Sequence, residues 1–296
     1  MTSRLIKKSA GIFAVSALLC TAACKKDISK ASQDSPAATL SDSSTVADNA
    51  YNDVLVNAFF GFSDQLNNVS GQSHAGGTTT NSANAVNTAP PLSCAAYTLV
   101  TAQGGGYPKT LTLDFGPNGC SGSFDGLMRK GKIIYIFSGS LLQPGTTVSA
   151  TFDQYYVNGY GLQGTCSITN TSTVNGFGFT LQTTNGIFTF PDLTNFHYSG
   201  NKVIAMTAGS NTPYDLSDDV YAITGNSNFS ASDGSSLVSN VSTPLVKAFT
   251  CPYISAGVIS FTYNQDTKGT IDFGDGTCDH TATLVVGSIT RQFNLR

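Results

Sequence analysis

Residues 109–116 read KTLTLDFG, and in this stretch leucine and phenylalanine alternate with polar residues. An alternation with a period of two is typical of a β-strand that buries one of its faces. The same period recurs in residues 148–153 and 177–181, without an intervening helical pattern that would favour a parallel sheet. For residues 93–296 the sequence therefore predicts an all-β fold, an antiparallel meander that forms a barrel or a sandwich.

Turn-forming dipeptides divide this region into segments of strand length. Asn-Gly and Asp-Gly pairs favour the tight turns that join antiparallel strands into hairpins. A two-residue turn at Asn185-Gly186 would place Leu181 opposite Phe190, so that both apolar faces agree. The dipeptides expected to form turns are Asn158-Gly159, Asn185-Gly186, Gly200-Asn201, Asp233-Gly234 and Asp275-Gly276.

The first of these hairpins requires a longer loop on the same argument. A two-residue turn would place Asp153 on the face of Leu162 and Cys166, where its charge would be buried. A three-residue loop over residues 158–160 avoids this and pairs Phe152 with Cys166 instead. We therefore predict a bulged or three-residue connection here.

Tyr155 is the candidate ligand-binding residue of this hairpin. In the predicted register it shares a solvent-facing side with Thr151 and Asp153. An exposed tyrosine ring can stack on a sugar, although packing across a half-exposed sheet explains the residue equally well.

One spacing recurs near both ends of the β region. A cysteine is followed by Asp-Phe-Gly, and a second cysteine comes after three further residues. The two copies enclose stretches of nearly equal length, which predicts two equivalent disulfides, Cys94–Cys120 and Cys251–Cys278. The alternative is four buried thiols that recur through an old duplication. Cys166 lies on an apolar strand face and is expected to be a small core residue.

The N-terminus has the pattern of a secretory signal. Residues 1–8 carry three positive charges, residues 10–20 are almost entirely apolar, and two alanines precede Cys24. The apolar run is too short to span a membrane, so we expect residues 1–23 to be a cleaved signal peptide. Export also favours disulfide formation, because secretory compartments are oxidising.

The residues around Cys24 and the twin motif carry a family resemblance. The row Thr21–Asp27 resembles the lipobox of Bacteroidota lipoproteins, and the twin Asp-Phe-Gly motif resembles a family of uncharacterised Bacteroidota outer-membrane lipoproteins. The resemblance implies a diacylglycerol on Cys24, a lipid bilayer as partner, and a position at the outer membrane, expected on the cell surface. It brings no known activity. The alternative is an ordinary secretory signal in which Cys24 is a stray thiol.

Between the signal and the β region the composition changes three times. Residues 24–47 are rich in Ser, Ala, Asp and Thr and are expected to form a flexible tether. Residues 48–67 carry an apolar stripe at helical spacing, with Asp48 placed as an N-cap, and predict one amphipathic helix. The helix is expected to dock on the β domain, and a partner-binding or membrane-lying role is the alternative. Residues 68–92 are expected to be a second linker. The apolar stripe of the predicted helix consists of Tyr51, Leu55, Phe59, Phe62 and Leu66.

Composition excludes several classes of function. The chain has 15 basic and 18 acidic residues, all of the latter Asp, and it lacks Trp. Without Glu, a glycosidase with a Glu pair and a His-Glu-x-x-His metalloprotease are excluded. An acidic chain lacks the basic footprint of a nucleic-acid-binding protein, so no nucleic acid is expected as a partner. We also expect no cofactor.

Two clusters of charged residues are candidate ligand-binding sites. Asp272, Asp275 and Asp279 offer oxygens to Ca²⁺, but a turn with solvated carboxylates explains them as well. The only basic cluster of the β region is Arg129, Lys130 and Lys132. Protection of a sheet edge is the ordinary explanation of such a cluster, and an anionic-ligand patch is the alternative.

Catalysis has no visible candidate. The histidines are scattered, at His74, His197 and His280, and no nucleophile elbow or Cys-x-x-Cys pair occurs. We therefore expect a non-catalytic binding or structural module of the cell envelope, with a glycan or an envelope protein as partner. The alternative is a polysaccharide-acting hydrolase whose carboxylates, such as Asp114 and Asp272, converge in a cleft. A third option is a subunit of an envelope assembly that docks through its helix.

Overall fold

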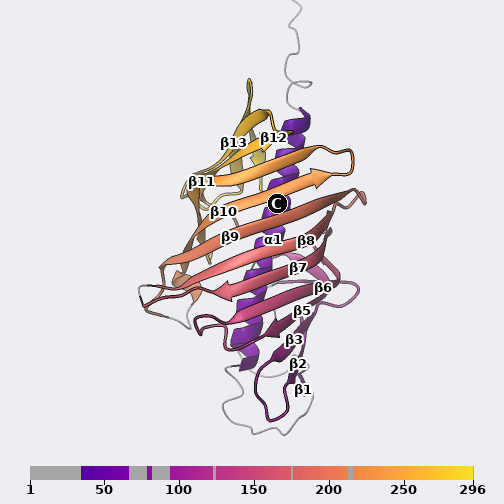
Figure 1. Cartoon of the computed structure of the whole chain (residues 1–296), viewed down its shortest axis with the longest axis vertical. Helices are drawn as coiled ribbons and strands as arrows, with labels where there is room; N and C mark the ends of the chain where they lie inside the picture. Colours follow the sequence, from indigo (N-terminus) through magenta and orange to yellow (C-terminus); the bar gives the residue numbers. More distant parts are fainter. Residues whose placement is uncertain are drawn as a thin grey trace, which may run out of the picture.

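The fold is one long helix and one antiparallel sheet (Figure 1). A computed structural model of the chain describes residues 35–66, 79–81, 94–122, 125–174, 176–212 and 216–295. The helix α1 spans Pro36–Leu66, and the short 3₁₀ helix η1 spans Leu216–Asp218. The strands are β1 (Thr79–Asn81), β2 (Ala96–Thr101), β3 (Lys109–Asp114), β4 (Cys120–Ser121), β5 (Met128–Phe137), β6 (Thr147–Val157), β7 (Tyr160–Asn170), β8 (Gly178–Thr189), β9 (Asn195–Ala208), β10 (Val220–Ala231), β11 (Ser236–Ala248), β12 (Ala256–Tyr263), β13 (Thr267–Asp275), β14 (Thr281–Val286) and β15 (Ile289–Asn294).

Each strand pairs with its neighbours in the chain. The order runs β1-β2-β3-β5 and then in sequence to β15, while β4 pairs with β5 beside this path. The predicted all-β fold and antiparallel meander are therefore confirmed. The predicted closure into a barrel or a sandwich is wrong, because the described strands form a single sheet that does not close.

Helix α1 begins twelve residues before the predicted helix. The Ser35 hydroxyl accepts a hydrogen bond from the Ala38 N–H at 3.2 Å, which makes Ser35 the N-cap, and Pro36 occupies the first helical position. The predicted tether of residues 24–47 is thus wrong from Pro36 onward. Asp48 is not the N-cap but a buried residue inside the helix.

The Ser- and Thr-rich start of α1 is buried rather than solvated. Ser41, Ser44 and Thr45 are each at most 3% exposed, and each hydroxyl donates to a carbonyl one turn back in the helix at 2.9 Å. These bonds satisfy the hydroxyls without a partner outside the helix. Small side chains therefore let the sheet approach α1 closely, and every residue of 40–61 is buried or half-buried.

Three carboxylates of α1 form ion pairs with three distant strands. Asp42 pairs with Arg291 on β15, and Asp48 pairs with Lys202 on β9 at 3.1 Å. Asp53 pairs with Arg129 on β5 at 2.7 Å. Because these strands lie far apart in the sheet, the pairs show that the sheet curls around the helix.

The Asp48 pair lies in the core. Its side chain and that of Lys202 are 7% and 3% exposed. Tyr198 donates to one carboxylate oxygen at 2.5 Å, and Ser227 donates to the other at 3.2 Å. Three hydrogen-bonding groups thus hold one buried carboxylate, which is the condition under which a buried charge is tolerated.

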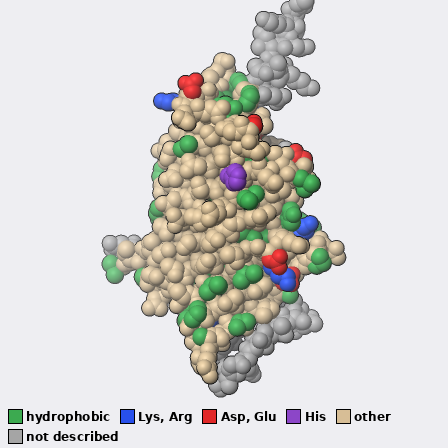
Figure 2. Space-filling view, turned by 45° about the vertical axis from the view of Figure 1, so that its right-hand side comes forward, with side chains coloured by type: hydrophobic (Ala, Val, Ile, Leu, Met, Phe, Trp, Pro, Cys, Tyr) green, Lys and Arg blue, Asp and Glu red, His purple; other side chains and the backbone are tan. Residues whose placement is uncertain are grey.

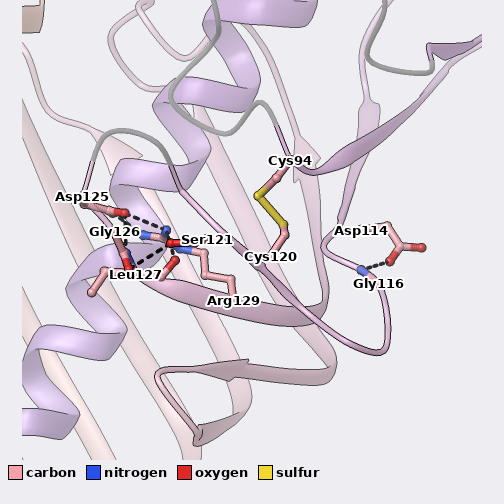
Figure 3. Close-up of a disulfide and its surroundings, with 9 residues drawn as sticks. All are labelled: Cys94, Asp114, Gly116, Cys120, Ser121, Asp125, Gly126, Leu127 and Arg129. Carbon is pink, nitrogen blue, oxygen red and sulfur yellow. Dashed lines mark hydrogen bonds and ion pairs between the residues drawn. A yellow bond between two sulfur atoms is a disulfide. The ribbon is translucent and has the colours of Figure 1, made fainter.

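Arg129 is buried too, contrary to both explanations of the basic cluster. It is 1% exposed and makes bidentate hydrogen bonds to the carboxylate of Asp53 on α1. It makes a second bidentate pair with Asp125 of the β4–β5 connection (Figure 3). Of the other two residues, Lys132 pairs with Asp114 at 3.1 Å near the surface, and the Lys130 amine lies over a tyrosine ring. The cluster therefore does not form an anionic-ligand patch.

Glycines produce the curvature of the sheet. Gly225 of β10 has φ +124°, and a Cβ at this position would lie 2.0 Å from the Asn201 carbonyl of β9. Gly131 of β5 has φ +78° and would similarly collide with the Gln154 carbonyl of β6. The strand register shifts at both glycines, which identifies them as parts of β-bulges.

Bulges also explain the errors in the turn predictions. Asn185-Gly186 lies at a register shift inside β8, and Gly200-Asn201 lies inside β9 without a turn. The predicted pairing of Leu181 with Phe190 is therefore wrong, since Leu181 pairs with Lys202. At residue 186 a Cβ would lie 2.8 Å from the hydroxyl of Tyr51, so this glycine makes room for the helix. Asp233-Gly234 does join β10 to β11.

The β6–β7 hairpin has the two-residue turn that we expected it to avoid. Val157 pairs with Tyr160, and Asn158 and Gly159 both have positive φ, as a type I′ turn requires. The pairing then shifts through a bulge at Gln154, which has φ +48°. This extra residue keeps Asp153 on the solvent side and directs Tyr155 inward.

Both predicted disulfides are confirmed. The Cα atoms are 5.9 Å apart in Cys94–Cys120 (Figure 3) and 5.8 Å apart in Cys251–Cys278. Cys166 is buried as predicted, and burial raises the pKa of its thiol to about 12. In each Asp-Phe-Gly motif the phenylalanine is buried and the Asp carboxylate accepts a hydrogen bond from the glycine N–H at 2.9 Å.

We predict that Asp48→Leu lowers the free energy of unfolding by about 3–5 kcal/mol, because it leaves Lys202 buried without its counter-charge. The double variant Asp48→Leu/Lys202→Met should be clearly more stable than the single variant, since no charge then remains to be compensated. Asp42→Ala, which breaks a partly exposed pair, should cost about 1 kcal/mol or less. Urea unfolding measures all three; equal losses in the single and double variants would contradict the prediction.

We also predict that Gly225→Ala destabilises the protein by at least about 3 kcal/mol, because backbone strain adds to a collision with the next strand. Gly234→Ala is the matched control: its φ is also positive, at +88°, but nothing lies within 4 Å of a Cβ there. The control should cost about 1–2 kcal/mol. Similar unfolding midpoints for the two variants would argue against a steric role of the bulge.

Candidate functional site

A cavity of about 270 Å³ lies between α1 and the inner face of the sheet, partly open to solvent. One side is formed by α1, and the other by residues of β9, β10 and β11, the β11–β12 and β4–β5 connections and the β6–β7 hairpin. Its lining consists of Val46, Asn49, Ala50, Asn52, Asp53, Leu55, Val56, Phe59, Asp125, Leu127, Val157, Asn158, Tyr160, Ile204, Tyr221, Ile223, Lys247, Phe249, Pro252, Tyr253 and Ile254.

The helix contributes one stripe to this cavity. Val46, Asn49, Asp53 and Val56 follow one another at steps of three and four residues, and this spacing places them on one face of α1. The opposite face carries Tyr51, whose hydroxyl donates to the carbonyls of bulged β7 and adjacent β8 at 2.8 and 3.3 Å. Contacts of that face with the sheet therefore hold the helix so that its second face borders the cavity.

Most polar groups of the lining are already used within the protein. Asp53 and Asp125 both bind Arg129. The Asn158 side-chain oxygen accepts a hydrogen bond from the Met128 N–H at 2.9 Å. The hydroxyl of Tyr221 donates to Asp219, and burial raises its pKa. These groups shape the wall, whereas a ligand would meet mainly aliphatic and aromatic surface.

Lys247 differs from these groups. Its ammonium donates a hydrogen bond to the Cys251 carbonyl, and none of the carboxylates in the described part of the chain lies within 4 Å of it. Burial lowers the pKa of Lys247 to about 8, although Asp53 and Asp125 act in the opposite direction from a greater distance. An amine of this kind, partly neutral near pH 8, lies in the wall of a mostly apolar cavity.

The three predicted calcium ligands are not brought together. Asp272, Asp275 and Asp279 each accept hydrogen bonds from residues two positions further along the chain, so each closes its own turn. Hydrogen bonds from Thr277 lower the pKa of Asp275, and those from Thr281 lower that of Asp279. Among the residues that the structure describes, no group of three His, Cys or Asp side chains could hold a metal ion.

The remaining sequence candidates do not form a site either. Asp114 on β3 and Asp272 on β13 lie toward opposite ends of the molecule, so a catalytic pair of these carboxylates is excluded (Figure 1). Tyr155 is 1% exposed and therefore presents no ring to a sugar, which corrects its assignment as a glycan contact. His197 and His280 are exposed.

Several predictions fall outside the described residues. Cys24, the signal of residues 1–23, His74 and most of the second linker of residues 68–92 belong to this group. Within the described residues, α1 does not have the length of apolar sequence that a membrane-spanning helix requires.

Comparison of the chain with protein-family models, with curated proteins and with solved structures found no match. The cavity and its lysine must therefore be interpreted from their own geometry.

Little in the sequence indicates this cavity. Lys247 follows four residues with no clear alternation, and β11 pairs with β12 through two register shifts. Period-two analysis cannot assign a face to a residue beyond such a shift. The apolar helix stripe was visible, but only the pairing of α1 with the sheet shows which of its faces is left open.

We predict that the protein gains about 2 kcal/mol of stability between pH 7 and pH 9.5 through Lys247. The folded-state pKa of about 8 lies below the ordinary 10.5, so the unfolded chain binds more protons in this range and stability rises with pH. Lys247→Met should lack this gain, whereas Lys268→Met, at an exposed lysine of β13, should keep it. Urea unfolding at both pH values gives the comparison, and identical pH profiles for all three proteins would contradict it.

Proposed function

We propose that this protein is a lipid-anchored lipoprotein of the outer membrane whose β domain is a non-catalytic binding module, and that it takes up a small apolar ligand in the cavity beside α1. The observation that carries the proposal is the cavity itself. Ligand sites are concave, mostly apolar and furnished with few polar groups, and this cavity has all three properties.

The volume of the cavity limits the ligand. At about 270 Å³ it lies just below the range of roughly 300–1,000 Å³ that is typical of drug-sized ligands. A molecule with one short aliphatic chain or one or two aromatic rings fits this space. A phospholipid with two long chains does not.

The rest of the molecule supports binding inside rather than on the surface. Asn and Thr are the commonest residues at the exposed strand positions, and the view in Figure 2 shows charged side chains only scattered over that face. The helix packs against the sheet of its own domain, and this argues against docking on a partner through a free helix. The two disulfides are consistent with export to an oxidising compartment, and the proposed anchor at Cys24 rests on the sequence pattern.

The proposal predicts saturable binding of an uncharged apolar fluorophore such as 1-aminoanthracene. Val56→Phe, which enlarges a helix residue that lines the cavity, should weaken binding by about tenfold or more because it fills the space. Val285→Phe is the matched control, since Val285 is exposed on β14 and is not among the residues that line the cavity. Fluorescence titration measures both. Absence of binding to the unaltered protein, or equal binding by the two variants, would refute the assignment of the cavity.

A further inference from the structure

Lys247 is the one cationic group that the described lining of the cavity presents to a ligand. The guanidinium of Arg129 is closed off by bidentate hydrogen bonds to two carboxylates. The Lys247 amine has three N–H bonds when protonated, and one of them is used by the Cys251 carbonyl. The others have no partner among the described residues, so the amine is available to a ligand.

The charges near the cavity favour an uncharged ligand. Asp53 and Asp125 carry two negative charges, and Arg129 and the protonated form of Lys247 carry two positive ones. The group is therefore neutral as a whole, and an added carboxylate or ammonium would be desolvated without compensation. Burial raises the pKa of Tyr221, another group in the wall, so its hydroxyl adds no charge there.

An amine held in an apolar wall is a nucleophile. Desolvation favours its neutral form, which carries the lone pair that attacks a carbonyl carbon. Because the folded-state pKa is about 8, a substantial fraction of Lys247 is neutral at pH 7–8. Buried lysines of this kind form Schiff bases with carbonyl compounds.

We propose that Lys247 captures a small apolar aldehyde or ketone that enters the cavity beside α1, and holds it as an imine. This inference rests on the proposed binding function and names its ligand class. In the reaction the amine nitrogen forms a bond to the carbonyl carbon, the carbonyl oxygen leaves as water with the two amine protons, and a carbon–nitrogen double bond results. Addition of water reverses the step, so no oxidant or reductant is required.

The test is reductive trapping with octanal and cyanoborohydride on the full chain, followed by peptide mass spectrometry. Lys247 should acquire the octyl group about tenfold faster than the exposed Lys268, because burial lowers the pKa of the Lys247 amine and the cavity concentrates the aldehyde. The labelling rate at Lys247 should rise with pH to a half-maximum near pH 8. Glyceraldehyde, which is polar and gains nothing from the apolar wall, should label Lys247 more slowly than octanal does.

Lys247→Arg provides the control variant, since it keeps the positive charge but cannot form an imine. It should lose the fast-labelled site, whereas Lys268→Arg, at an exposed lysine outside the cavity lining, should keep that site and bind 1-aminoanthracene as the unaltered protein does. If the fluorophore binds but octanal labels Lys247 no faster than Lys268, the inference is overturned while the binding function stands. If neither ligand binds, both are overturned. Equal labelling of Lys247 by octanal and glyceraldehyde would also overturn the inference, since it would show that the apolar wall does not select.

Discussion

The structure depends on how three carboxylates of one helix are neutralised inside a sheet. A helix buried on nearly all sides cannot leave a charge without a partner, because an isolated carboxylate in a low-dielectric interior costs many kcal/mol. Asp42, Asp48 and Asp53 meet their cations on β15, β9 and β5. Each pair fixes the position of α1 relative to a different part of the meander. The same contacts specify both the depth of the helix and the extent to which the sheet curls around it.

The parts of this fold that could be predicted are those with local signals. Strand alternation and the twin spacing around Cys94 and Cys251 depend on a few neighbouring residues, and both predictions are confirmed. The start of α1 was missed because serine and threonine usually indicate solvent, although Ser35-Pro36 is a recognisable start signal. In α1 these hydroxyls donate hydrogen bonds to carbonyls of the helix itself. The polar composition therefore wrongly predicted a flexible tether. Burial between distant strands is a non-local property that no window of sequence contains.

The turn dipeptides also show that a local signal does not decide its own structural role. A glycine that permits positive φ serves a hairpin turn at Gly159 and a bulge at Gly225 equally well. Its role is decided by the neighbouring strand, since a Cβ at Gly225 would strike Asn201 whereas a Cβ at Gly159 would not meet its paired strand. The bulge at Gln154 then reverses the faces assigned beyond it. This reversal explains why the candidate Tyr155 is found in the core.

The cavity follows from the same arrangement of helix and sheet. Ion pairs and the Tyr51 hydrogen bonds hold one face of α1 against β7, β8 and β9, while Val46, Asn49 and Val56 on the other face border the cavity. A helix that was free to shift would close this space to recover packing contacts. Because movement would separate Asp48 from Lys202, this buried ion pair opposes closing of the cavity. The buried charges that determine the fold are therefore also what keeps a ligand-sized space open beside Lys247.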